Sequence, residues 1–216
     1  MDKGDGNPIL CITMMSDTEF ATAGLKHFKT WTYVKGNLKS KRGTMSQLGR
    51  KYSQKLVSLC AYKNKYLTGT IKGDLIIWCG NKPTKSSKPK LFPKALDTIQ
   101  TTEQGVLLGD RSGLVIMLNE SLQETHKFTL TEIEGVVSVH PGINAIHLED
   151  QRLIVGTRGS EIFEFKFDVR SGEIDYKDVV THGHFHPCKK DNNEVWGLAT
   201  FPNKDQYVTT SDDGTL

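Results

Sequence analysis

The sequence predicts an all-β protein that forms about four and a half four-stranded blades of an incomplete β-propeller. Three observations support this prediction. Short segments rich in β-branched and aromatic residues are bounded by Gly, Asn, Asp or Ser, which is typical of strands joined by tight turns. No stretch of about 11 residues or more has the apolar spacing of a helix. The same plan of segments returns every 39 to 48 residues, and a long common period indicates a repeat architecture.

Each repeat contains an apolar stretch, a second stretch that ends in small residues, a tight turn, and a third stretch that ends in a large side chain. The first stretches are residues 9–14, 56–61, 95–101 and 144–148. The second stretches are residues 20–24, 66–70, 106–110 and 153–157. The third stretches are residues 27–31, 74–78, 114–117 and 161–165, and they end in Trp31, Trp78, Met117 and Phe165. A fifth copy begins with residues 195–201 and 207–210.

We therefore expect blade cores at about 9–43, 55–92, 95–128, 143–180 and 195–216, the last of them truncated. The alternative is an irregular sandwich or barrel, whose strands need no such common period. Because the fifth copy is incomplete, we also expect the chain to be a piece of a longer protein. An open propeller would expose apolar sheet faces and unpaired strand edges.

The composition is that of a globular chain with a substantial core. Of its 216 residues, 37% are hydrophobic and 25% are charged, which argues against disorder. No apolar run approaches the roughly 18–20 residues of a membrane span. The N-terminal residues do not resemble a signal peptide, and the four cysteines are far apart with no CxxC. We expect a cytoplasmic protein with reduced thiols and no association with a membrane.

The net charge of +3 hides a strong asymmetry along the chain. Residues 1–100 hold 18 Lys and Arg against 6 Asp and Glu, a net charge of +12. Residues 101–216 hold 10 against 19, a net charge of −9. A basic half of this size indicates a polyanionic partner.

The end of the chain contains a recognisable repeat signature. Residues 211–216 read SDDGTL, which resembles the turn between the second and third strands of a WD40 blade. Gly183 and His184 are similar to the Gly-His that opens such a repeat. The resemblance implies that His184, Ser211 and Asp213 take part in a buried hydrogen-bond chain that locks the blade, since buried polar groups must be paired. Trp31 and Trp78 are expected to be core anchors of the first two blades.

A more specific resemblance begins in the N-terminal third. LKHFKTW at 25–31, LKSKRG at 38–43 and TGTIKGDLIIW at 68–78 occur in the order found in the echinoderm microtubule-associated protein-like (EMAP-like) family. WGLATFP at 196–202 is similar to that family's WGLATHP, with Phe201 in place of His. The resemblance implies non-catalytic WD40 propellers that associate with tubulin and microtubules, in some members with cilia. The segment at 82–142 departs from the pattern.

Two basic runs lie in the strongly positive half, and both are expected in surface connections. The first comprises Lys35, Lys39, Lys41, Arg42, Arg50, Lys51 and Lys55, and residues 35–55 contain no acid. The second comprises Lys82, Lys85, Lys88, Lys90 and Lys94. The first run is the candidate surface for an anionic partner such as the glutamate-rich tails of tubulin. The alternative interpretation is that the first run is a solvated, positively charged loop with no binding role. Aromatic residues do not alternate with these basic residues, which makes nucleic acid a poorer candidate.

The cluster HGHFHPC at 182–188 offers the only candidate metal ligands: His182, His186 and Cys188. Structural zinc sites normally take two separated pairs of ligands, and no second pair is evident, so a loop with one structural histidine is the favoured interpretation. The sequence has no GxSxG, GxxxxGK[ST] or HExxH motif. We expect no enzyme activity, no cofactor and no small-molecule substrate.

The sequence therefore predicts a WD40 scaffold of an EMAP-like protein that binds tubulin or microtubules and other proteins. Its expected location is the cytoskeleton, including the cilium or spindle. The alternative is a generic WD40 adaptor that presents substrates in a complex such as a ubiquitin ligase. In that case the loops on the face of the propeller would determine specificity, and the basic runs would be incidental.

Overall fold

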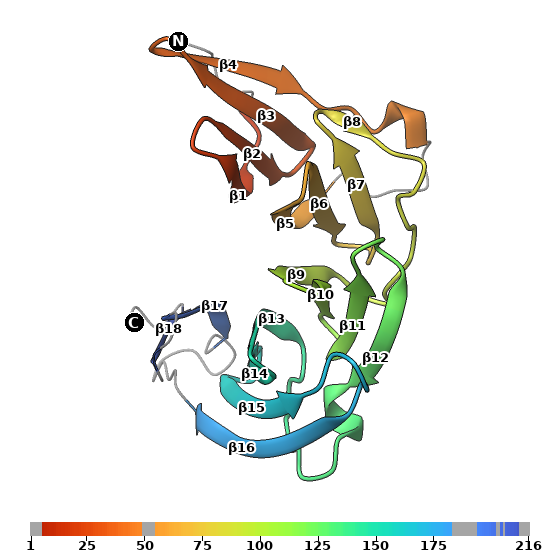
Figure 1. The fold of residues 1–216 in the computed structure, drawn as a ribbon, viewed down its shortest axis with the longest axis vertical. Coiled ribbons are helices and arrows are strands. Elements are labelled where there is room, and N and C mark those ends of the chain that lie inside the picture. Colours follow the sequence, from red (N-terminus) through yellow and green to blue (C-terminus); the bar gives the residue numbers. More distant parts are fainter. Residues whose placement is uncertain (1–5, 49–54, 183–193, 202–203, 205, 212–216) are drawn as a thin grey trace. The chain divides into compact units, whose positions relative to one another are not determined.

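A computed structural model describes residues 6–48, 55–182, 194–201, 204 and 206–211. In these residues the chain forms antiparallel sheets that follow one another in sequence (Figure 1). Four sheets have four strands and one has two. The chain divides into two compact units, Met1–Thr101 and Thr102–Leu216. No helix in the described parts of the chain has the length and apolarity needed to cross a membrane.

The first unit contains two complete sheets, each a simple up-and-down meander. The first sheet is formed by β1 (Ile9–Ser16), β2 (Glu19–Gly24), β3 (His27–Val34) and β4 (Asn37–Arg42). A single 3-10 turn, η1 (Ser46–Leu48), follows. The second sheet is formed by β5 (Leu56–Tyr62), β6 (Lys65–Thr70), β7 (Leu75–Cys79) and β8 (Lys82–Pro83). The predicted strand segments of the first two repeats thus form β1 to β3 and β5 to β7.

The other sheets follow the same order. The third consists of β9 (Leu96–Thr102), β10 (Gly105–Asp110), β11 (Leu114–Asn119) and β12 (Glu124–Thr129), and η2 (Leu130–Glu132) follows it. The fourth consists of β13 (Ile143–Glu149), β14 (Arg152–Thr157), β15 (Glu161–Phe167) and β16 (Ile174–His182). The described part of the fifth is a pair, β17 (Val195–Thr200) and β18 (Tyr207–Ser211).

Each unit has its own apolar core between consecutive sheets. In the first unit, Ala21, Ala23 and Phe28 pack against Leu56, Tyr66, Ile76 and Trp78. In the second unit, a larger core is built around the three phenylalanines of β15, at positions 163, 165 and 167. These side chains come from the alternating positions of strands, so the apolar segments seen in the sequence are the strand faces that meet between sheets.

A polar contact closes the turn between the second and third strands in three of the sheets. In the second sheet the Thr70 hydroxyl donates to Asp74 Oδ2 at 2.7 Å, and Asp74 is fully buried. In the third sheet Asp110 Oδ1 accepts the backbone N–H of Leu114 at 3.0 Å. In the fourth sheet the Thr157 hydroxyl donates to the Glu161 carboxylate. Asp110 ends its second strand, whereas Asp74 and Glu161 lie four residues beyond theirs. All three carboxylates are buried and are stable because they are hydrogen-bonded within the turn.

Candidate protein-interaction surface

The predicted basic residues 35–42 lie on the β3–β4 hairpin rather than in a loop. Lys35 and Gly36 form its two-residue turn with positive φ values of 49° and 78°, which is the geometry of a tight hairpin turn with the twist of its strands. β4 is an edge strand of the first sheet. An exposed edge strand with lysines is stable as a strand while its charges discourage edge-to-edge association.

The basic side chains of β4 project from both faces of the hairpin. Lys39 pairs with Thr32, and Lys41 pairs with Thr30, so these two lysines share one face. Arg42 pairs with Lys29 and lies on the other face. Lys35, Lys39, Lys41 and Arg42 are all exposed. None of the three lysines forms an ion pair in the described parts of the chain, so this edge presents uncompensated positive charge.

The remaining basic residues continue this surface only in part. Lys55 is exposed and forms a bridge with Leu25 at the start of the second sheet. Arg50 and Lys51 lie outside the described residues. In the second run, Lys82 is in β8, and the backbone of Lys88 pairs with Leu75 of β7. Lys82 and Lys88 of the second run are therefore held beside β7, at the β8 edge of the second sheet.

A pocket of about 470 Å³ lies beside the end of β4. It is lined by Lys26, His27, Phe28, Arg42, Gly43, Thr44, Met45, Ser46, Leu56 and Trp78. Phe28 stacks on Trp78 with ring centroids 3.9 Å apart and an interplanar angle of 17°. The pocket therefore combines an apolar floor with cationic and hydroxyl groups. This mixture is typical of sites that bind one side chain or a small ligand.

Hydrogen bonds hold the two tryptophans of the first unit in place, and one of them, Trp78, lines this pocket. The Trp78 indole Nε1 donates to the Thr68 hydroxyl at 2.9 Å, and both residues are fully buried. Trp31, which is half-buried, makes the equivalent bond to Thr22 at 2.9 Å. Thr22 Oγ1 also lies 2.8 Å from His27 Nε2. The tryptophans of the third strands are thus tied to threonines of the second strands.

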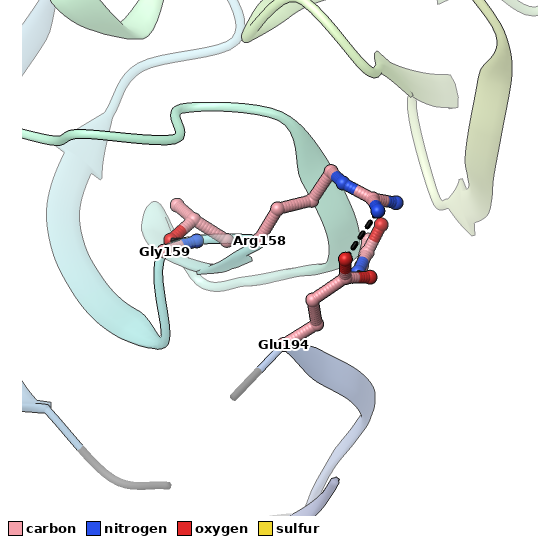
Figure 2. Close-up of polar contacts among 5 residues, drawn as sticks. Arg158, Gly159 and Glu194 are labelled. Atoms are coloured by element: carbon pink, nitrogen blue, oxygen red, sulfur yellow. Dashed lines mark hydrogen bonds and ion pairs between the residues drawn. The ribbon is translucent and has the colours of Figure 1, made fainter. Parts of the chain in front are cut away.

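The second unit has a polar cluster that joins the fourth sheet to β17 (Figure 2). Arg158, in the turn after β14, forms an ion pair with Glu194, the residue before β17. The Asn144 side-chain amide donates to Glu194 at 3.1 Å. The Arg158 guanidinium also lies 5.8 Å from the ring centre of Trp196, which is 48% exposed. Glu194 is buried and has two cationic or polar partners, which is the condition for a buried carboxylate to be stable.

A smaller cavity of about 360 Å³ in the second unit is lined by His147, Glu149, Asp150, Arg152, Ile154, Thr200, Lys204 and Gln206. His147 Nε2 lies 2.7 Å from the Thr200 hydroxyl. Burial lowers the pKa of His147 below its ordinary 6.5, although the neighbouring Glu149 acts in the opposite direction. The ring is therefore favoured in its neutral form, which suits a structural contact between β13 and β17.

Several predicted site residues lie outside the described residues: His184, His186, Cys188 and Asp213. His182 is the last residue of β16, and Ser211 is the last residue of β18. In the described parts of the chain, no group of three or more His, Cys, Asp or Glu side chains is placed to hold a metal ion.

Two features of these sites have little signal in the sequence. The Arg158–Glu194 pair joins residues 36 positions apart, and the pocket beside β4 combines side chains from both sheets of the first unit. The Thr68–Trp78 bond has a clearer signal. A threonine precedes the tryptophan of the third strand by ten residues in the second repeat and by nine residues in the first.

These consecutive four-stranded meanders are blades of a WD40-type β-propeller. The WD40 propeller domain of Doa1 matches 98% of this chain with a TM-score of 0.69 and 11% identity, and the match covers 64% of that domain. The computationally designed Ika8 protein matches 96% of this chain with a TM-score of 0.64 and 15% identity, over 56% of its own length. The predicted all-β propeller class is confirmed.

Among curated proteins, the chain is similar to a ciliary WD-repeat protein and to an echinoderm microtubule-associated protein-like protein. It is 24% identical over 201 residues to the ciliary WD repeat-containing protein ctxp80 of Euplotoides octocarinatus. It is 25% identical over 213 residues to echinoderm microtubule-associated protein-like 4 of Xenopus tropicalis. The predicted resemblance to EMAP-like WD40 proteins is therefore confirmed. The chain spans 25% and 20% of the length of these relatives, respectively. No family model matches the chain.

Proposed function

We propose that this chain is a non-catalytic WD40 scaffold that binds tubulin or microtubules, together with other protein partners, through the basic edge of its first sheet. The observation that carries the proposal is the set of exposed, unpaired lysines on the β3–β4 hairpin, Lys35, Lys39 and Lys41. A polyanionic protein surface is attracted to such an edge, and the attraction weakens as salt screens it.

The similarity to a ciliary WD-repeat protein and to an EMAP-like protein supports microtubules as the anionic partner. It also supports a location at the cytoskeleton, with the cilium as one site. The interaction surface needs no catalytic group: it acts by charge and shape, as repeat scaffolds do. A ligase adaptor remains the competing function, and no specific contact of the described residues favours it.

Co-sedimentation of the 216-residue chain with polymerised tubulin, at low and at raised salt, tests the proposal. The double variant Lys39→Glu, Lys41→Glu should weaken binding at low salt by about tenfold, since it reverses two surface charges that each contribute roughly 0.2–1 kcal/mol. The matched control is Lys127→Glu, Lys166→Glu, which changes two exposed strand lysines of the acidic half. This control should bind like the unaltered chain.

Three results would contradict the proposal. The first is absence of binding at low salt, and the second is binding that does not change with salt. The third is an equal loss of binding in both double variants, which would mean that net charge alone matters and the β4 edge does not. An affinity purification dominated by ligase subunits without tubulin would favour the adaptor function instead.

A further inference from the structure

The pocket beside the end of β4 has features that a simple basic surface does not need. We propose that it anchors one aromatic side chain of an acidic peptide, whose flanking carboxylates pair with Lys26 and Arg42 at the rim. This inference rests on the proposed function, because it assigns an anionic protein partner to the same basic edge. It adds that recognition depends on an aromatic residue within the acidic segment, beyond charge alone.

The floor of the pocket is apolar and already in place. Phe28 is 3% exposed, Leu56 is 1% exposed, and both pack in the core of the first unit with Trp78. Half-buried Met45 forms part of the wall and packs against the same core. An entering ring therefore meets side chains that are fixed by their own packing, so little ordering is required when it binds.

The rim of the pocket is cationic and hydrophilic. Lys26 is exposed, in a turn where its φ is 50°, and Arg42 Nη2 donates to the Lys26 backbone oxygen at 3.4 Å. This contact holds the guanidinium near the mouth. Thr44 and Ser46 add two exposed hydroxyls whose oxygens are 3.3 Å apart. The described residues that line the pocket include no acid. Charge complementarity therefore selects a ligand that carries carboxylates.

The shape of the pocket selects a protein ligand over nucleic acid. Single-stranded nucleic acids bind to successive exposed aromatic rings on which bases stack. Here the two stacked rings are almost completely buried and form the floor of a single pocket. One bulky group can enter, while the rest of an extended ligand follows the basic residues of β4. An acidic peptide with one aromatic residue meets both conditions.

Two peptides of equal charge test the proposal. In the first, four glutamates flank a tyrosine on each side, and in the second a glycine replaces the tyrosine. Both carry a fluorescent label, and binding to the 216-residue chain is measured by anisotropy at low salt. The tyrosine peptide should bind about tenfold more tightly, because burial of a ring adds apolar contact that glycine lacks. Equal affinities of the unaltered chain for the two peptides would overturn the proposal.

A matched pair of variants locates the effect. Ser46→Phe places a ring in the pocket, whereas Ser86→Phe places one at an exposed serine that lies outside it. The two serines are alike locally, since Ser86 contacts Thr84 as Ser46 contacts Thr44. Ser46→Phe should abolish the preference for tyrosine and keep the affinity for the glycine peptide, which also reports that the variant is folded. Ser86→Phe should keep the preference.

The outcomes separate this inference from the proposed function. If microtubules and both peptides bind but tyrosine gives no advantage, the pocket proposal fails and the basic edge remains. If the tyrosine peptide is preferred but microtubules do not bind, the pocket proposal holds and the partner is another acidic protein. A preference that persists in Ser46→Phe, or a loss of both peptides, contradicts the assignment to this pocket. Displacement of the tyrosine peptide by a single-stranded oligonucleotide would assign the pocket to nucleic acid instead.

Discussion

Replacing Thr68 by valine should destabilise the first unit through one lost hydrogen bond. Valine has nearly the shape of threonine but cannot accept the bond from the Trp78 indole Nε1, which is 2.9 Å from the Thr68 hydroxyl. Both residues are fully buried, so water cannot replace the missing acceptor. A buried donor left without a partner costs about 1–3 kcal/mol. We expect the free energy of unfolding to fall by that amount.

A double-mutant cycle separates this bond from other effects of the substitution. Trp78→Phe removes the indole N–H, so Thr68→Val made in that background should cost less than about 0.5 kcal/mol. The measurement is a urea titration followed by far-ultraviolet circular dichroism, because tryptophan fluorescence changes with Trp78 itself. Thr101→Val, at an exposed strand threonine of the same unit, should leave stability within about 0.5 kcal/mol.

Two results would refute the reasoning. One is a cost below about 0.5 kcal/mol for Thr68→Val in the unaltered chain. The other is the same cost with and without Trp78, which would mean that the threonine acts through packing and not through the hydrogen bond.

Three further predictions concern other parts of the fold. Because burial lowers the pKa of His147, the unfolded chain takes up a proton there before the folded chain does as the pH falls below about 6.5, so the second unit should lose stability on acidification. The melting temperature of His147→Gln should therefore fall less steeply with decreasing pH than that of the unaltered chain. Identical pH dependences of the two melting temperatures would contradict this. Burial raises the pKa of Cys60 to about 12, so exposed Cys79 should be alkylated before Cys60 when modification is followed by peptide mapping. Equal alkylation rates at the two cysteines would disprove this. A Cβ at Gly43 would lie 2.5 Å from Phe28 Cδ1, so Gly43→Ala should cost about 1–3 kcal/mol in the same urea titration; a neutral result would show that the ring can move aside.

The architecture could be predicted from sequence because each strand carries its own signal. The apolar segments of the third strands and the small residues that end the second strands are local patterns, and they recur with a common period. Strand β4 is different: its sequence NLKSKR has one apolar residue and no alternation. It is a strand because β3 offers a hydrogen-bonding edge and the Lys35-Gly36 turn returns the chain to it. That information lies in the pairing with the preceding strand and not in an apolar pattern of the segment itself, which is why the sequence of this segment predicts a connection.

The candidate sites were predictable to different degrees. The basic charge of residues 35–42 is a property of the sequence itself, and only its arrangement on two faces of a hairpin required the structure. The pocket beside β4 depends on Phe28 and Trp78 meeting across two sheets, 50 positions apart in the chain. No local pattern reports such a meeting, because alternation shows which face a side chain occupies but not which neighbour covers it.

The first two sheets show how far the sequence of a strand determines the surroundings of its side chains. Trp31 and Trp78 lie in the third strands of their sheets, and each donates its indole N–H to a threonine of the second strand at 2.9 Å. Each also sits directly opposite an aromatic residue, Phe20 in the first sheet and Tyr66 in the second. The two tryptophans therefore share the same hydrogen bond and the same cross-strand aromatic partner position, and the sequence predicts this equivalence.

Burial nevertheless differs between these faces, since Trp78 is fully buried and Trp31 only half-buried. On the first strand, Ile12 and Met14 share the face of Trp31 and are 65% and 56% exposed. The corresponding face of the second sheet is covered by Ala21, Ala23 and Phe28 of the first. Local sequence thus specifies the tryptophan–threonine hydrogen bond within a blade, whereas the degree of burial is set by the neighbouring sheet. For that reason the two tryptophans are equivalent in sequence but unequal in their contribution to stability: a substitution at Trp78 removes core packing, and one at Trp31 removes a partly solvated contact.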